Sequence, residues 1–164
     1  MPDWSQISSV MMVCHGNICR SPMAECVLAH LLKEAGLNGI AVASSATSTE
    51  ELGNPIHPGA LAELRRHGVP IRSHRAVQLR RDDLAGYDLF LGMDSRNLVN
   101  MRRILGEESC PRCFRLLDFS GRARDIADPW YSGDFRETWD DILEGCQAIV
   151  AELRQAGKKR EAYS

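Results

Sequence analysis

The sequence predicts an α/β fold in which a parallel β-sheet lies between two layers of helices. Short apolar runs typical of buried strands alternate with longer segments whose apolar residues recur at helical spacing. This alternation is characteristic of parallel sheets, because parallel neighbours need a crossover connection that is usually a helix. The length of 164 residues, with 44% hydrophobic residues, suits one domain with a core of its own.

The expected elements follow in a simple order along the chain. Strands are predicted at 8–14, 40–46, 87–93 and 114–117, and helices from residue 21 onward and at 58–67, 94–105 and 134–156. Ser21 and Pro22 are expected to open the first helix, because serine is a favoured N-cap and proline suits the first helical position. Gly157 is expected to end the last helix and leave 158–164 as a flexible tail of the single domain 1–164.

Composition excludes several classes of protein. Twenty basic residues against 22 acidic ones leave a net charge of −2, which argues against a nucleic-acid binder. Residues 1–13 lack a signal-peptide pattern, and no apolar run reaches the length of a membrane span. We therefore expect a cytoplasmic protein, in which the six cysteines are core residues, metal ligands or reactive thiols.

The loop between the first strand and the first helix is the strongest candidate site. In parallel sheets, ligands bind beyond the carboxyl ends of the strands, and the first strand ends at Cys14. Backbone N–H groups of the loop and the positive end of the helix dipole would hold an oxyanion there. The predicted phosphate-binding residues are His15, Gly16, Asn17, Ile18, Cys19 and Arg20. Arg20 adds a planar fork that can bind two oxygens at once.

The same surroundings favour the thiolate form of Cys14, which would be a nucleophile aimed at the bound phosphorus. Ser21 can donate a hydrogen bond to this thiolate. A phosphatase also needs an acid for the departing oxygen, and Asp128 in ADPWY is the candidate. Trp130 and Tyr131 could form a wall for an aromatic leaving group.

VCHGNICRSPMAE and the later DPWY together resemble the low-molecular-weight protein tyrosine phosphatases. The resemblance includes Ser45, GNPIHPGA at 53–60, SHRA at 73–76 and MDSRN at 93–97, and it covers nearly the whole chain. It implies a four-stranded parallel sheet in an α/β/α arrangement, with the Cys-x5-Arg phosphate-binding loop after the first strand. It also implies a phosphotyrosine-containing protein as substrate and no need for a metal or another cofactor.

Roles of individual residues follow from the resemblance. Cys14 would be the nucleophile of a two-step reaction through phosphocysteine, Arg20 would bind the phosphate, and Asp128 would act as proton donor and then as base. Four residues would support them: Asn17 would form a network with Ser45 and His74, and Asp94 would orient Arg20. Cys19 would trap an oxidised Cys14 as a reversible disulfide.

The predicted substrate pocket departs from many relatives. Glu50 and Glu51 stand where an aromatic residue is often found, so we expect acidic phosphopeptides to be disfavoured and basic flanks to be preferred. Ile18 resembles the phosphotyrosine-specific members, because members that act on phosphoarginine tend to carry threonine there. We expect a monomer, although the sequence does not decide the oligomeric state.

Cys110 and Cys113 allow more than one interpretation of their role and of the protein's activity. Their spacing suits a metal site, but no second pair exists, so redox pairing or packing is favoured over zinc. Arsenate reductases of related fold use the same loop with two downstream cysteines, which makes an oxidoreductase the leading alternative to a phosphatase. A catalytically silent phosphoprotein-binding module is the third alternative.

Overall fold

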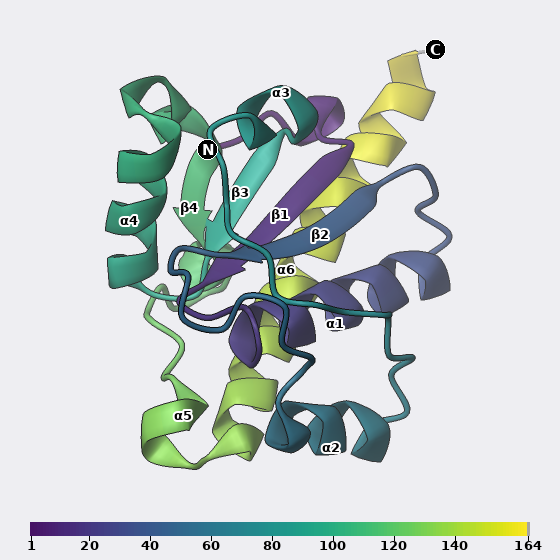
Figure 1. Cartoon of the computed structure of the whole chain (residues 1–164). Helices are drawn as coiled ribbons and strands as arrows, with labels where there is room; N and C mark the ends of the chain where they lie inside the picture. The colour runs from purple at the N-terminus through teal and green to yellow at the C-terminus, as the bar shows by residue number, and fades with distance from the viewer. Residues whose placement is uncertain (164) are drawn as a thin grey trace.

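In the computed structural model, four parallel strands form one sheet in the order β2-β1-β3-β4 (Figure 1). The strands are β1 (Ser9–Cys14), β2 (Ala41–Ala46), β3 (Leu89–Gly92) and β4 (Cys113–Arg115). The structure describes the backbone of residues 1–163 and the side chains of residues 1–158. The predicted class and strand order along the chain are confirmed. β4 is shorter than predicted, because the chain turns at Leu116 into a short 3-10 helix that ends at Phe119.

Helices cover both faces of this sheet, as the three-layer prediction requires. The helices are α1 (Arg20–Glu34), α2 (Pro58–Arg66), α3 (Asp83–Gly86), α4 (Ser95–Leu105), α5 (Pro129–Ser132) and α6 (Phe135–Tyr163). Alternate residues of β1 point to opposite faces. Val10 and Met12 join the large core cluster with residues of α1 and α6, and Met11 and Val13 join a smaller one with residues of α4.

The strand order places a ligand site at the carboxyl ends of β1 and β3. The chain passes from β1 to β2 on one side and then crosses to β3 on the other side of β1 (Figure 1). This reversal separates the loops that follow β1 and β3, and a crevice opens between them. The loop after β1 begins at Cys14, and β3 is followed by Asp94 at the start of α4.

Two predicted helix boundaries are wrong. Ser21 is not the N-cap of α1, because the helix already begins at Arg20 with Cys19 as N-cap. Gly157 does not end α6, which continues to Tyr163. One interior glycine costs a helix only about 1 kcal/mol, and the good helix formers that follow it offset this cost. The prediction of a flexible tail concerns residues whose side chains, from 159 on, lie outside the described part.

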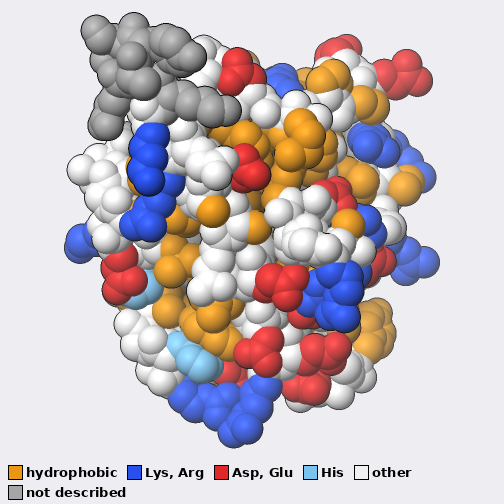
Figure 2. Space-filling model, turned by 180° about the vertical axis from the view of Figure 1, so that it is seen from behind, with side chains coloured by type: hydrophobic (Ala, Val, Ile, Leu, Met, Phe, Trp, Pro, Cys, Tyr) orange, Lys and Arg blue, Asp and Glu red, His pale blue; other side chains and the backbone are white. Residues whose placement is uncertain are grey.

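Charges of both signs are interspersed on the surface. On the face opposite to the view of Figure 1, Lys and Arg side chains lie among Asp and Glu side chains (Figure 2). Arg124, for example, pairs with Asp141 at 2.6 Å and with Glu144 at 2.8 Å. Among the helices that the structure describes, none combines the length and apolar composition needed to cross a membrane.

Two glycines of α6 provide a test of the packing. A Cβ atom at Gly145 would lie 2.6 Å from Cγ of buried Leu116, whereas a Cβ atom at Gly157 would meet nothing within 4 Å. We predict that Gly145→Ala lowers the free energy of unfolding by about 1–3 kcal/mol. Gly157→Ala should raise it by about 0.5–1 kcal/mol, because alanine favours a helix interior. Urea denaturation measures both changes, and equal effects would contradict this packing.

Candidate active site

The loop between β1 and α1 forms one side of a pocket at the carboxyl edge of the sheet. The pocket is lined by Cys14, His15, Gly16, Ile18, Cys19, Arg20, Glu50, Glu51, Asp128, Trp130 and Tyr131. The structure thus brings together residues that are more than 100 positions apart in the chain, including both glutamates and both aromatic residues predicted for the pocket. Asn17 is the one predicted phosphate-binding residue outside the lining, and it lies buried beneath the loop.

The sulfur of Cys14 faces two hydrogen-bond donors. The backbone N–H of Asn17 donates to Sγ at 3.2 Å, and Oγ of Ser21 lies 3.0 Å from it. Nδ2 of Asn17 donates to the same Ser21 Oγ at 2.7 Å. The serine hydroxyl lies closer to the sulfur than to its other acceptor, the carbonyl of Ser45 at 3.5 Å, so its proton favours the sulfur. Two donors that converge on one sulfur are suited to hold negative charge that develops there during a reaction.

Asn17 holds the loop in an unusual backbone conformation. Its φ of 59° is the only positive value at a residue other than glycine in the described backbone. Oδ1 of Asn17 accepts from the N–H of Val77 at 3.1 Å, and its carbonyl oxygen lies 2.6 Å from Nε2 of His74. Left-handed conformations persist in non-glycine residues only where the surroundings fix them, and these contacts do so.

The predicted serine of this network is wrong. Ser44, not Ser45, accepts from Nδ2 of Asn17 at 3.0 Å, and its Oγ donates to Oε1 of Glu25 at 2.7 Å. The register explains the choice, because Ser44 lies level with Met12 and shares the face of Cys14, while Ser45 lies level with Val13. Oγ of Ser45 is buried without a hydrogen-bond partner among the described residues.

Glu25 and Arg72 extend the network to the surface. Oε2 of Glu25 pairs with Nη1 of Arg72 at 3.1 Å, and the same Nη1 donates to the carbonyl of Val42 at 2.8 Å. Neither residue was predicted from the sequence. The only signal for Glu25 is its position one helical turn after Ser21, on a helix that opens next to the site.

Arg20 is the buried cation of the site, with only 3% of its side chain exposed. Its Nη1 donates to Oδ2 of Asp94 at 2.7 Å and to the carbonyl of Ile126 at 2.8 Å, and Nη2 lies 3.4 Å from Oδ2 of Asp128. Burial opposes the charge, but Cys14 and the two carboxylates outweigh it and raise the pKa of the guanidinium. Arg20 therefore stays charged beside Cys14.

Asp94 has two tasks at the end of β3. Its Oδ1 accepts from the N–H of Asn97 at 2.7 Å and caps α4, while Oδ2 receives Arg20. Oδ1 of Asn97 accepts in turn from the N–H of Asp94 at 3.2 Å, which completes a capping box. The predicted contact between Asp94 and Arg20 is thus present in the structure.

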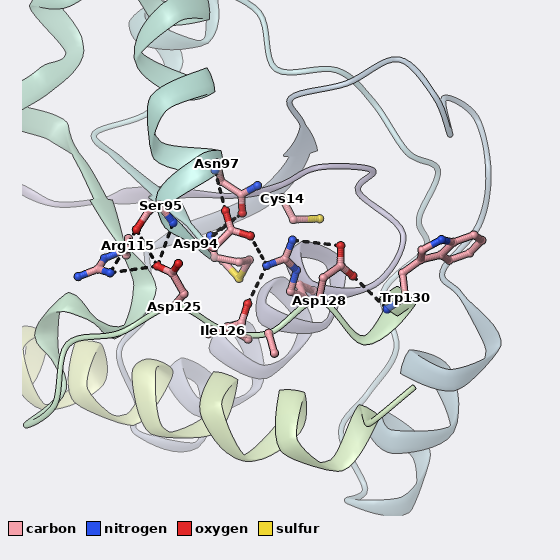
Figure 3. Close-up of polar contacts among 12 residues, drawn as sticks. Cys14, Asp94, Ser95, Asn97, Arg115, Asp125, Ile126, Asp128 and Trp130 are labelled. Atoms are coloured by element: carbon pink, nitrogen blue, oxygen red, sulfur yellow. Dashed lines mark hydrogen bonds and ion pairs between the residues drawn. The ribbon is translucent and has the colours of Figure 1, made fainter. Parts of the chain in front are cut away.

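Asp128 is the N-cap of α5 and faces the pocket from the side opposite the loop. Its Oδ1 accepts from the N–H of Trp130 at 3.0 Å, which leaves Oδ2 toward Arg20 (Figure 3). One quarter of the Asp128 side chain is exposed, so a bound substrate can reach it.

The aromatic wall has a support that the sequence analysis did not identify. Trp130 is 58% exposed and Tyr131 is 85% exposed. The ring of His57 lies edge-on to the ring of Trp130, with 5.9 Å between the ring centroids. It stacks on the ring of Phe135, with 5.2 Å between the centroids. The backbone N–H of His57 also donates to the carbonyl of Ile18 at 2.8 Å. His57 therefore connects the wall to the phosphate loop.

The remaining cysteines lie in different surroundings. Cys113 belongs to the smaller core cluster, on the face of the sheet opposite to Cys14, and Cys110 is exposed. Neither lines the pocket, so neither is placed to form a disulfide with Cys14, as a reductase relay would require. Cys19 does line the pocket, and burial raises its pKa to about 12. A disulfide between Cys14 and Cys19 stays a prediction.

Comparisons with known proteins agree with this geometry. A profile of the family described as low molecular weight phosphotyrosine protein phosphatase matches residues 9–159. The chain belongs to this family. It is 37% identical over 150 residues to the low molecular weight protein-tyrosine-phosphatase YfkJ of Bacillus subtilis, covering 90% of this chain and 96% of that protein.

Solved structures show the same fold. The crystal structure of YfkJ aligns with a TM-score of 0.86 and 35% identity, covering 92% of this chain and 96% of that one. A Drosophila arginine phosphatase aligns with a TM-score of 0.79 and 26% identity, covering 87% and 95%. Family membership and these relatives identify the chain as a phosphatase enzyme that acts on phosphoproteins.

The two neighbouring serines of β2 test the network beneath the loop. Ser44→Ala removes a partner from Asn17 and from Glu25, so we predict a loss of about 1–3 kcal/mol in the free energy of unfolding. Inorganic phosphate should also bind more weakly, because Asn17 holds the loop. Ser45→Ala is the matched control and should change both quantities little, since its Oγ has no partner. The reverse ranking of the two variants in urea denaturation and phosphate titration would contradict the network.

Proposed function

We propose that the enzyme hydrolyses phosphotyrosine in proteins through a phosphocysteine intermediate, with Cys14 as nucleophile, Arg20 as phosphate ligand and Asp128 as acid and base. One observation supports this assignment above the others. A sulfur with two convergent donors, a buried arginine and a carboxylate with one quarter of its side chain exposed line the same pocket. Each of these groups suits one requirement of phosphoryl transfer to a thiolate.

Substrate binding would use the loop and the arginine. A phosphoryl group that enters the pocket meets the loop that precedes α1 and the positive end of this helix. Nη2 of Arg20 faces the pocket beside Asp128, while Nη1 is held by Asp94 and Ile126. The fixed Nη1 orients the guanidinium plane, so that little entropy is lost when it binds two phosphate oxygens.

In the first step, the thiolate of Cys14 attacks phosphorus. The S–P bond forms as the bond from phosphorus to the tyrosine oxygen breaks, and the electron pair of that bond goes to the oxygen. Asp128 gives its proton to this oxygen, because a phenolate of pKa about 10 is a poor leaving group near neutral pH. The products of this step are tyrosine and phosphocysteine.

In the second step, a water molecule attacks phosphorus and gives a proton to the carboxylate of Asp128. The S–P bond breaks, its electron pair returns to Cys14, and inorganic phosphate leaves. The Ser21 hydroxyl and the Asn17 N–H, which contact the sulfur at 3.0 and 3.2 Å, stabilise the departing thiolate.

The pocket walls favour a phosphorylated aromatic side chain. Trp130 and Tyr131 offer exposed ring faces beside Asp128, and a phenol ring can stack on them. Ile18 gives the loop an apolar side chain at the pocket. The relative that is an arginine phosphatase makes phosphoarginine the competing substrate class for this site.

The proposed setting of the enzyme is a reducing compartment, as the cytoplasm is. All six cysteines are unpaired, and the nucleophile would lose its function as a disulfide. We retain a monomer as the proposed state.

Hydrolysis of aryl phosphates tests the assignment of roles. Cys14→Ser should lower kcat for p-nitrophenyl phosphate by at least about a thousandfold, because the nucleophile is lost. Asp128→Asn should lower kcat for phenyl phosphate by about a hundredfold or more, because the leaving oxygen lacks a proton donor. Wild-type protein should turn over phosphotyrosine faster than phosphoarginine. A full rate in Cys14→Ser, or preference for phosphoarginine, would overturn the proposal.

Peptides with charged flanks test the acidic mouth of the pocket. Glu50 and Glu51 line it, and Nε2 of His15 lies 3.0 Å from Oε2 of Glu50. Exposed charges interact weakly, so we predict a KM about two- to fivefold lower for a phosphotyrosine peptide with basic flanks than for one with acidic flanks. The difference should shrink in Glu50→Gln and Glu51→Gln and at high salt. Equal KM values in the wild type would contradict this preference.

A further inference from the structure

Asp125 is a carboxylate near the site that does not line the phosphate pocket. Its Oδ1 accepts three hydrogen bonds, from the N–H of Ser95 at 2.9 Å, from Oγ of Ser95 at 2.8 Å and from Nη1 of Arg115 at 3.0 Å (Figure 3). Burial opposes its charge, but these hydrogen bonds outweigh it and lower the pKa of Asp125. The half-exposed carboxylate is therefore held as an anion among three donors.

The partners of Asp125 are themselves fixed. Arg115 ends β4, and its Nε and Nη2 both lie 2.9 Å from Oδ1 of Asp118. Ser95 is the first residue of α4, next to the Asp94 that holds Arg20. At the start of α4, Asp94 thus contacts Arg20, and the next residue, Ser95, contacts Asp125 in the segment that leads to Asp128.

Asp125 also stands close to Asp128 along the chain. Between them, the N–H of Ile126 donates to the carbonyl of Met93 at 2.9 Å, and the carbonyl of Ile126 accepts from Arg20. Three residues span at most about 10 Å, so a fixed Asp125 restricts where the carboxylate of Asp128 can lie. Without Asp125, the segment would lose its hydrogen bonds to Ser95 and Arg115 and keep those at Ile126 and a longer one, 3.3 Å, from Oγ1 of Thr138 to the carbonyl of Ala127. The position of Asp128 would then depend on fewer contacts.

We propose that Ser95, Asp125 and Arg115 form a clamp that positions Asp128 for proton transfer to the leaving oxygen. The proposal rests on the acid role of Asp128 in the proposed function. Asp125 is then a positioning residue, because it acts through Asp128 and lies outside the pocket. A purely structural role would lower kcat/KM for every substrate alike, whereas a positioning role would lower kcat/KM, which reports formation of the phosphocysteine, only for substrates whose leaving oxygen needs the proton.

The leaving group separates the two roles. Phenyl phosphate needs a proton on its departing oxygen, whereas p-nitrophenolate leaves without one. We expect Asp125→Ala to lower kcat/KM for phenyl phosphate by about tenfold, because small displacements of a catalytic group are costly. We compare kcat/KM because kcat also contains the second step, in which Asp128 acts as base for every substrate. For p-nitrophenyl phosphate, kcat/KM should fall less than about twofold. In an Asp128→Asn background, Asp125→Ala should cause no further loss with phenyl phosphate.

Asp88 provides the matched control. Its Oδ2 accepts from the N–H of Ser8 at 2.8 Å and from the Oγ of Ser8 at 3.1 Å, just before β3 begins at the opposite end of the sheet. Asp88→Ala removes similar hydrogen bonds and should leave both rates unchanged. If Asp125→Ala does not fold, Ser95→Ala removes one donor of the clamp and should show the same selective loss in smaller size.

The outcomes distinguish the two proposals. An equal loss with both substrates, or a further loss in the Asp128→Asn background, would overturn the clamp and leave the proposed function standing. If Asp128→Asn itself shows no selective loss with phenyl phosphate, the acid assignment fails and the clamp fails with it. Asp125→Asn, which keeps an oxygen acceptor at this position, should recover part of the rate with phenyl phosphate.

Discussion

The buried guanidinium of Arg20 is the constraint on which the site depends. A charge with 3% of its side chain exposed is costly unless every donor finds a partner. Asp94 and the carbonyl of Ile126 supply partners from two different segments, and each must approach within 2.8 Å or less. The hydrogen bonds of Arg20 therefore hold the start of α4 and the segment before Asp128 against the loop after β1.

A network of hydrogen bonds centred on Asn17 also orders the site. Val77 donates to Oδ1 of Asn17, which fixes the amide so that Nδ2 donates to Ser21 and to Ser44. Ser21 can then donate its proton to the sulfur of Cys14, which lies closer than the carbonyl of Ser45. On the other branch, Ser44 donates to Glu25. One branch of this network therefore ends at the sulfur of Cys14 and the other at the carboxylate of Glu25.

Prediction from sequence succeeded where the signal is local. The loop after the first strand and the starts of the helices predicted at 58–67 and 94–105 depend on neighbours within a few residues, and α2 and α4 begin at Pro58 and Ser95. It failed at Ser45, because two adjacent serines differ only in the face of the sheet that they occupy. It also failed at Gly157, where the weak cost of a single glycine does not decide the end of a helix.

Sequence alone determined the α/β class, the phosphate-binding loop and the candidate acid, since these follow from hydrophobic periodicity and from motifs read within short segments. The tertiary structure alone decided which side chains meet. It placed Cys113 on the far face of the sheet from Cys14, chose Ser44 as the partner of Asn17 and joined Asp125 to Ser95 across 30 residues. These pairings depend on strand register and on crossovers between strands, and no short segment of the chain encodes either.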